Sequence, residues 1–244
     1  MHRFYLEHIP SVGTFTLPDT IATQISKVLR MRPGEVIHVF DGKGSEYPLT
    51  LTHVGRDGVS GELGAQMPEV SEPRTQITLY QSLLKKDKFE WVLEKGTEIG
   101  MARFVPMLTA RTVADQVSEN KLTRWQRICI EAAEQSRRTR IPEIANLQTL
   151  EQALDALTVA ATYDLVLILH EAAAKVTLKQ QLDLLAESAQ SVGLLVGPEG
   201  GFTPDEVQRA AQCGIVAVNL GPRVLRAETA GLVAAANVLF ALEG

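Results

Sequence analysis

The sequence predicts an α/β protein in two parts, a small N-terminal β-barrel and a larger domain with a mostly parallel sheet. Alternating strand patterns separated by turns fill residues 1–70. Residues 67–74 (MPEVSEPR) contain two prolines and are typical of a linker. From residue 75 onward, short apolar strand patterns alternate with helical patterns, which favours a parallel sheet covered by helices. We therefore expect domains at 1–70 and 75–244.

The elements of the N-terminal part are short and are separated by turn sequences. We expect one helix over residues 20–29, followed by strands over residues 35–40, 47–54 and 59–63. The dipeptides Asp41-Gly42 and Asp57-Gly58 lie between these strands and are typical of hairpin turns. Short strands joined in this way favour a small barrel.

The larger domain shows five strand patterns and six helical patterns. The expected strands cover residues 77–83, 104–108, 164–169, 193–196 and 215–220. The expected helices cover residues 87–99, 121–138, 150–157, 178–190, 204–213 and 228–242. Gly100 and Gly214 follow two of the helices, where glycine is a common stop signal.

The composition is that of an ordinary globular protein and excludes several classes. Of the 244 residues, 45% are hydrophobic and 22% are charged, and the net charge is −5, so no overall basic field indicates nucleic acid. No apolar stretch is long enough for a transmembrane helix, and the N-terminus is not a signal peptide, so we expect a cytoplasmic protein. Cys129 and Cys213 form no CxxC motif, so we interpret them as buried thiols, and we expect no metal site.

The stretch LLVGPEGGFTPDEV (194–207) combines a buried strand, a glycine-rich loop and a helix start. Thr203 occupies the N-cap position and Glu206 lies three residues later, as in a capping box. Strand, glycine loop and helix N-terminus together are typical of a nucleotide site. The loop contains the carboxylate of Glu199 and no Lys or Arg, which is unsuited to phosphate.

Two further strand ends lie near this motif in the chain. Residues 219–230 (NLGPRVLRAETA) again leave a strand and enter a helix, and Leu169-His170-Glu171 follow a third strand. Because the carboxyl ends of neighbouring parallel strands meet at one edge of a sheet, the three loops can line one crevice. S-adenosylmethionine fits such a site, because it has an adenosine and an amino-acid end but no phosphate.

The familiar dinucleotide and ATP motifs are absent. The loop at 197–201 does not match GxGxxG, and the GKG at 42–44 lacks the glycine that a P-loop needs upstream. Even so, a tight turn without ligand explains 197–201 almost as well when that loop is considered alone. Glu228 and Thr229 could simply favour a helix N-terminus, and His170 and Glu171 could be solvated. Trp91 and Trp125 are expected in the core.

GPEGG followed by LGPRVLRAETA resembles the SPOUT methyltransferases, and most closely the family that methylates N3 of a uridine in 16S ribosomal RNA of the small subunit. Residues 94–100 (EKGTEIG) resemble that family's "K-x-T-E-L-G" run, with Ile in place of Leu. Residues 131–138 (EAAEQSRR) and Ile141-Pro142 resemble another of its runs, and residues 28–34 (VLRMRPG) resemble its RNA-binding element.

The resemblance implies a C-terminal trefoil knot, a homodimer, and a PUA-like fold for the N-terminal barrel. It implies S-adenosyl-L-methionine as cofactor and the small ribosomal subunit as partner. The cofactor-binding residues that it indicates are Leu169, His170, Glu171, Gly197, Pro198, Glu199, Gly200, Gly201, Leu220, Gly221, Leu225, Arg226, Glu228, Thr229 and Ala230.

N3 of a uridine carries a proton and is a poor nucleophile until that proton leaves. Arg226 is the first candidate to stabilise the resulting anion, and Arg138 and Glu98 are further candidates, the latter as base. For RNA phosphates we expect the cations Arg30, Arg32, Lys85, Lys86, Arg137 and Arg138. The alternatives are another α/β nucleotide enzyme, such as a dehydrogenase, and a non-catalytic RNA-binding factor in ribosome assembly.

Overall fold

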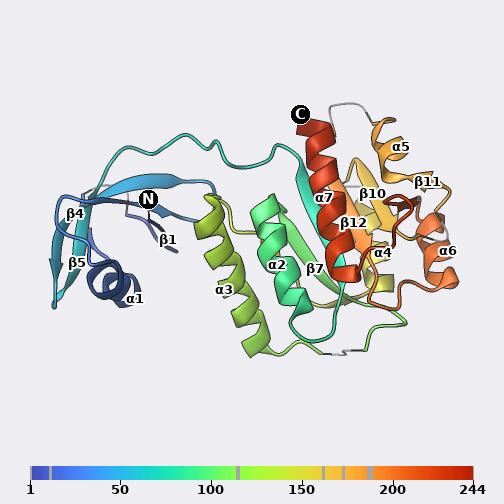
Figure 1. The fold of residues 1–244 in the computed structure, drawn as a ribbon, viewed down its shortest axis with the longest axis horizontal. Helices are drawn as coiled ribbons and strands as arrows, with labels where there is room; N and C mark the ends of the chain where they lie inside the picture. The colour runs from blue at the N-terminus through green and yellow to red at the C-terminus, as the bar shows by residue number, and fades with distance from the viewer. Residues whose placement is uncertain are drawn as a thin grey trace. The chain divides into compact units, whose positions relative to one another are not determined.

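A computed structural model describes residues 2–10, 13–113, 116–160, 163–171, 174–185 and 189–243 (Figure 1). The chain divides into two compact units. One consists of Met1–Glu72 with Ala133–Ile141, and the other consists of Pro73–Ala132 with Pro142–Gly244. The first is a small, mostly antiparallel β unit and the second is a parallel α/β unit, which confirms the fold class expected from the sequence.

The first unit is a five-stranded sheet packed around one helix. The strand order is β1-β3-β4-β5-β2. The bounds are β1 (Arg3–Tyr5), β2 (Thr14–Thr16), α1 (Asp19–Thr23), β3 (Val36–Phe40), β4 (Glu46–Gly55) and β5 (Gly58–Leu63). Ala22 and Ile25 are buried in one apolar cluster with Val39, Leu49 and Val59 of the strands.

The expected α-helix over 20–29 is only half correct. After α1 the chain continues as a π-helix, Gln24–Leu29. The segment ends where Arg30 takes a left-handed conformation with φ of 53°. There the N–H of Met31 donates to the carbonyl of Ile25, a longer reach than an α-helical hydrogen bond.

The second unit contains an eight-stranded sheet in which all the recorded strand pairs are parallel. The order is β11-β13-β10-β12-β6-β7-β8, and β9 also pairs with β7. The strands are β6 (Gln76–Ser82), β7 (Arg103–Leu108), β8 (Glu143–Ile144), β9 (Gln148–Thr149), β10 (Leu165–Leu169), β11 (Val176–Thr177), β12 (Ser191–Val196) and β13 (Val216–Asn219).

Helices cover both faces of this sheet. The helices that follow β6 in the chain are α2 (Lys88–Ile99), α3 (Glu119–Ser136), α4 (Leu150–Ala160), α5 (Leu178–Leu182), α6 (Pro204–Gln212) and α7 (Ala227–Glu243), and Trp125 of α3 stacks on Phe89 of α2. Tyr80 of β6 lies in an apolar cluster with Leu154 of α4 and Val207 of α6. Leu79, the preceding residue of β6, points to the other face, where α2 and α7 lie side by side (Figure 1). Both faces are therefore buried, as is usual for a parallel sheet.

The last helix returns across the sheet. It follows β13 in the chain, yet it packs beside α2 and against β6 and β12, past the intervening strand β10. Gly231 allows this close approach, because a Cβ there would lie 2.9 Å from Leu79 Cδ1. The trefoil knot that the resemblance implies stays a prediction.

Several expected elements differ from the structure. The helix expected over 178–190 ends at Leu182, Leu184 beyond it is exposed, and residues 186–188 of the expected span lie outside the described residues. The short strands β1, β2, β8, β9 and β11 were not expected, because two or three residues carry too little pattern. Trp125 is buried as expected, but Trp91 is 42% exposed, so its assignment to the core was wrong.

Cys129 is buried and Cys213 is partly buried, and both are free thiols. In the described part of the chain, no helix is both long and apolar enough to span a bilayer. Among the same residues, no cluster of three or more His, Cys, Asp or Glu side chains is arranged to hold a metal ion.

Candidate functional site

A pocket of about 650 Å³ lies at the carboxyl edge of the parallel sheet, within the second unit. Segments that follow β10, β12 and β13 in the chain form most of its wall. Lys88, which follows β6, and Arg111, which follows β7, also line it. The lining residues are Lys88, Arg111, Leu169, His170, Glu171, Val196, Gly197, Pro198, Glu199, Gly200, Gly201, Phe202, Val218, Asn219, Leu220, Gly221, Arg223, Val224, Leu225, Arg226, Ala227, Glu228 and Ala230. The crevice expected from the sequence is therefore present.

The glycine loop, residues 197–201, makes a tight turn with little room for a side chain at Gly197. The N–H of Gly201 donates to the carbonyl of Pro198 at 2.9 Å. A Cβ on Gly197 would lie 3.1 Å from both Gly201 C and Phe202 N. Gly201 itself has a φ of 67°, which favours glycine. The loop can thus present bare backbone to the pocket.

The helix after this loop begins with the capping box that the sequence predicts. Thr203 Oγ1 accepts from the N–H of Glu206, and Glu206 Oε2 accepts from the N–H of Thr203 at 2.7 Å. The other carboxylate oxygen of Glu206 accepts from the N–H of Ala110 at 2.8 Å. Glu206 is buried, so this one side chain joins the start of α6 to the segment that follows β7.

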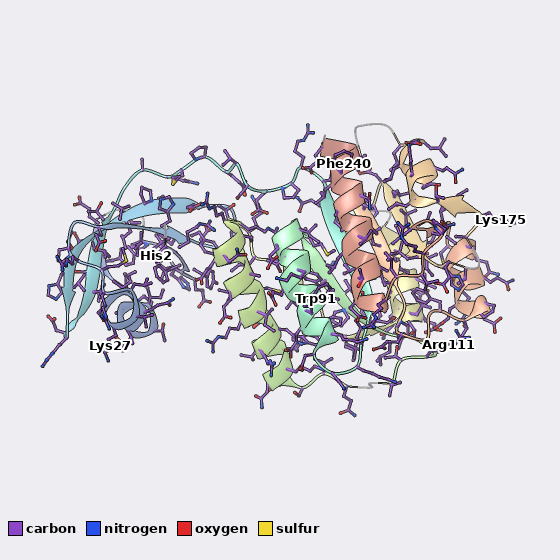
Figure 2. The ribbon with its side chains drawn as sticks, viewed as in Figure 1. His2, Lys27, Trp91, Arg111, Lys175 and Phe240 are labelled. Carbon is purple, nitrogen blue, oxygen red and sulfur yellow. The ribbon has the colours of Figure 1, made fainter. Side chains whose placement is uncertain are left out.

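Arg111, labelled in Figure 2, supports the glycine loop from the same segment. Its Nη1 donates to the carbonyls of Gly200 at 2.6 Å and Phe202 at 3.4 Å. A Cβ on Gly200 would lie 3.2 Å from the Arg111 side chain, so the two pack closely. The guanidinium therefore fixes where the carbonyls of the loop point.

Opposite charges meet inside the pocket. Lys88 Nζ lies 3.1 Å from Glu228 Oε1 and 3.6 Å from Glu199 Oε1. Burial by itself would raise the pKa of the Glu199 carboxyl. The backbone N–H groups of Glu199 and Lys85 and the Lys88 ammonium outweigh that effect, so its pKa is lowered from the ordinary value of 4.5. Glu199 is thus held in the ionised form.

The second loop, residues 219–230, forms another part of the pocket wall. Gly221 has a φ of 103°, and its N–H donates to Asn219 Oδ1 at 3.1 Å. The carbonyl of Arg226 accepts from the N–H groups of Thr229 and Ala230, both at 2.9 Å, which starts α7. Arg226 itself is exposed at the pocket wall.

Comparisons with known proteins agree with this architecture. A family model described as an RNA methyltransferase domain matches residues 71–239, and one described as an RNA methyltransferase PUA domain matches residues 25–63. Ribosomal RNA small subunit methyltransferase E of Bacillus subtilis is 31% identical over 253 residues, which covers 100% of this chain and 98% of that protein. The chain belongs to this methyltransferase family.

Other members of the family are equally similar. The Mycobacterium bovis protein of the same name is 35% identical, over 95% of this chain and 88% of its own length. A crystal structure of the Neisseria gonorrhoeae protein, bound to S-adenosyl methionine according to its description, superposes with a TM-score of 0.86. It is 34% identical, and the match covers 98% of this chain and 97% of that chain.

In this family member, the structure brings together all of the cofactor-binding residues named from the sequence except Thr229, which does not line the pocket. Its N–H is used in the first turn of α7. Of the three catalytic candidates, only Arg226 lines the pocket. Glu98 instead accepts from Lys95 Nζ at 2.7 Å on α2.

Arg138 has a structural environment in the first unit. It is only 4% exposed, and its Nη2 lies 2.7 Å from Glu72 Oε2. Glu72 Oε1 also accepts from the N–H groups of Thr139 and Arg140. Both partners of this ion pair are buried, and Arg138 is not among the residues that line the pocket of the second unit.

The remaining RNA-binding candidates are exposed, namely Arg30, Arg32, Lys85, Lys86 and Arg137. Sequence analysis missed the roles of Lys88 and Arg111 in the pocket. Neither residue is among the candidates that the sequence indicates. Both residues lie shortly after a strand of the sheet, and this position could have indicated that they reach the site at the carboxyl edge.

The lowered pKa of Glu199 predicts how its contribution to stability changes with pH. An ionised Glu199 stabilises the fold fully above its unfolded pKa of 4.5, and this contribution is lost as the pH falls through the lower folded-state pKa. The difference in Tm between the wild type and Glu199→Gln should therefore stay constant from about pH 7 to about pH 5 and shrink at lower pH. Thermal unfolding followed by circular dichroism measures it, and a difference that has already vanished at about pH 5 contradicts the assignment.

Proposed function

We propose that the protein transfers a methyl group from S-adenosyl-L-methionine to N3 of a uridine in 16S ribosomal RNA of the small subunit. The observation that carries the proposal is the glycine-lined pocket formed by strand-exit segments in a chain of the RNA methyltransferase family. The names of its relatives support the RNA substrate, and the cofactor in the Neisseria structure supports S-adenosylmethionine. The assembled subunit is made in the cytoplasm, which is where we expect the protein to act.

The residues present fit this cofactor. The volume of about 650 Å³ is in the range of small-molecule sites. A Cβ at Gly197 would crowd the turn, so the loop offers backbone N–H and C=O groups instead of side chains. Backbone groups of this kind can bind an adenine edge closely without neutralising any phosphate. Glu199 and Glu228 add negative charge beside them, which suits a cationic ligand.

In the proposed complex, the two loops would bind opposite sides of the cofactor. Gly197, Gly200 and Gly201 would contact it from one side, and Leu220, Gly221, Leu225 and Ala230 from the other. When bound, the cofactor supplies an electrophilic methyl group on a cationic sulfur that leaves as a neutral thioether. The leaving group needs little assistance. The chain therefore has to align the reactants and stabilise the uridine anion that forms when N3 loses its proton.

Arg226 is the residue proposed to help the uridine. Loss of the N3 proton leaves a negative charge shared by O2 and O4 of the base, and a guanidinium beside those atoms stabilises it. Arg226 is the one catalytic candidate named from the sequence that lines the pocket, at the start of α7. Its exposure leaves its N–H groups accessible to an incoming base.

The first unit is proposed to bind RNA through exposed cations. Arg30 and Arg32 lie just after the π-helix, and Arg137 lies in the segment that packs with the same unit. Lys85 and Lys86 are exposed ahead of α2 in the second unit. Contacts from such cations to phosphates position RNA without reading its sequence.

The proposed reaction is tested by methyl transfer to RNA. Small ribosomal subunits that lack the modification are incubated with the protein and labelled S-adenosylmethionine, and the digested RNA is analysed by nucleoside mass spectrometry. We expect 3-methyluridine in 16S RNA. A label in another nucleoside overturns the assignment to N3, and no label in RNA overturns the proposed function.

In the same assay, Arg226→Ala should lower the single-turnover rate by about 10²-fold to 10³-fold, as expected when a donor to a developing negative charge is removed. Cofactor affinity, measured by calorimetry, should stay close to that of the wild type, because the backbone of the second loop is unchanged. Glu98→Gln is the matched comparison, since Glu98 lies outside the pocket. Equal losses of rate and affinity in Arg226→Ala would count against the catalytic role.

We also propose that the protein is a homodimer. Two large apolar side chains on neighbouring helices support this, Trp91 of α2 at 42% exposed and Phe240 of α7 at 82% exposed (Figure 2). Large exposed aromatic residues are typical of protein interfaces. Sedimentation analysis should give a dimer for the wild type and a monomer for Phe240→Glu. A monomeric wild type at micromolar concentration is the contrary result.

A further inference from the structure

Lys88 connects three segments of the pocket that are far apart in the chain. It is the first residue of α2, whereas Glu199 lies in the glycine loop and Glu228 in the first turn of α7. Lys88 Nζ lies 3.1 Å and 3.2 Å from the two carboxylate oxygens of Glu228. It lies 3.6 Å from Glu199 Oε1. We call these three residues the Lys88 bridge.

The ammonium group of Lys88 offsets the repulsion between the carboxylates of Glu199 and Glu228. Glu199 and Glu228 come from different segments and approach the same ammonium group, so without Lys88 two negative charges would lie close together. The side chain of Glu228 is only 12% exposed, so water screens this repulsion poorly. Lys88 is the cation that the structure records in contact with both carboxylates among the described residues.

The segment that carries Lys88 also holds the glycine loop through its backbone. The N–H of Lys85 donates to Glu199 Oε1 at 3.2 Å, the same oxygen that faces Lys88. Lys86 has a φ of 57°, so the chain turns sharply between these two contacts. Residues 85–88 therefore hold the glycine loop through the side chain of Glu199. Arg111 holds it through the carbonyl of Gly200.

We propose that Lys88 is a positioning residue that fixes the glycine loop and the start of α7 at the separation that binds a cationic amino-acid cofactor. The inference rests on the proposed function, because it specifies how the same pocket is held ready for S-adenosylmethionine. Lys88 acts through Glu199 and Glu228, and it leaves a partial negative charge on that side of the pocket. A sulfonium or ammonium group is the complement of that charge.

Lys95 provides a matched control on the same helix. Its Nζ also contacts two carboxylates, Glu94 at 2.8 Å and Glu98 at 2.7 Å. The two lysine side chains are exposed to the same extent, 33% for Lys88 and 35% for Lys95. Lys95 does not line the pocket, so Lys95→Ala removes an equivalent ion pair from α2 without touching the cofactor loops.

The test is a double-mutant cycle read by calorimetric binding of S-adenosylmethionine to the full chain. Lys88→Ala should weaken binding about tenfold or more, and Lys88→Arg should restore most of it, because the positive charge returns. Lys95→Ala should bind like the wild type. The loss caused by Lys88→Ala should be smaller in a Glu228→Gln background, since no second carboxylate is then left facing Glu199.

Three results would overturn the proposal. They are wild-type affinity in Lys88→Ala, an equal loss in Lys95→Ala, and a Lys88→Ala loss of the same size with and without Glu228→Gln. Unfolding temperatures of all variants separate misfolding from weakened binding. If the wild type itself fails to bind S-adenosylmethionine, the proposed function falls. In that case, the unfolding temperatures of the same variants measure the coupling of Lys88 with Glu228. If the effects of Lys88→Ala and Glu228→Gln on unfolding temperature are additive, the bridge is overturned.

Discussion

The parallel direction of the strands in the larger sheet is the constraint on which the site depends. In a parallel sheet every strand ends at the same edge, so segments that follow β6, β7, β10, β12 and β13 meet there although they are widely separated in the chain. Each segment contributes something different. The segments after β12 and β13 contain the glycines, and those after β6 and β7 supply Lys88 and Arg111, whose side chains contact the glycine loop. An antiparallel sheet with the same residues would divide them between two opposite edges.

The glycine loop shows how side chains from neighbouring strands determine a backbone conformation. Glu206 joins the N–H of Ala110 to the cap of α6, and Arg111 holds the carbonyls of Gly200 and Phe202. On the other side, the N–H of Lys85 and the ammonium of Lys88 hold Glu199. Free backbone groups are useful for binding only when they are fixed before the ligand arrives, because ordering them later would weaken binding. These contacts supply that fixation.

The local parts of the site could be predicted from the sequence, whereas the contacts across the sheet could not. Thr203, Pro204 and Glu206 specify a capping box by their spacing alone, and the structure contains it. Lys88 and Arg111 reach the pocket because β6 lies next to β12 and β7 lies next to β6. Local sequence patterns do not indicate the order of strands in a sheet, so the roles of Lys88 and Arg111 could not be predicted.

Burial was the other property that the sequence did not reveal. A cluster of basic residues at the end of α3 is typical of a solvated surface, yet Arg138 lies buried against Glu72, a residue of the segment expected to be a linker. The helix expected over 178–190 ends at Leu182, and Leu184 beyond it faces solvent. For Arg138, the partner that decides its burial is distant in sequence.

The most direct test of the account is equilibrium binding of two nucleotides to the full chain by calorimetry. Because the glycine loop contains the carboxylate of Glu199 and no Lys or Arg that could bind phosphate, we predict that one S-adenosylmethionine binds per chain and that NAD does not bind. Binding of NAD with no binding of S-adenosylmethionine would contradict the central claim that these strand ends form a site for a cationic adenosine cofactor.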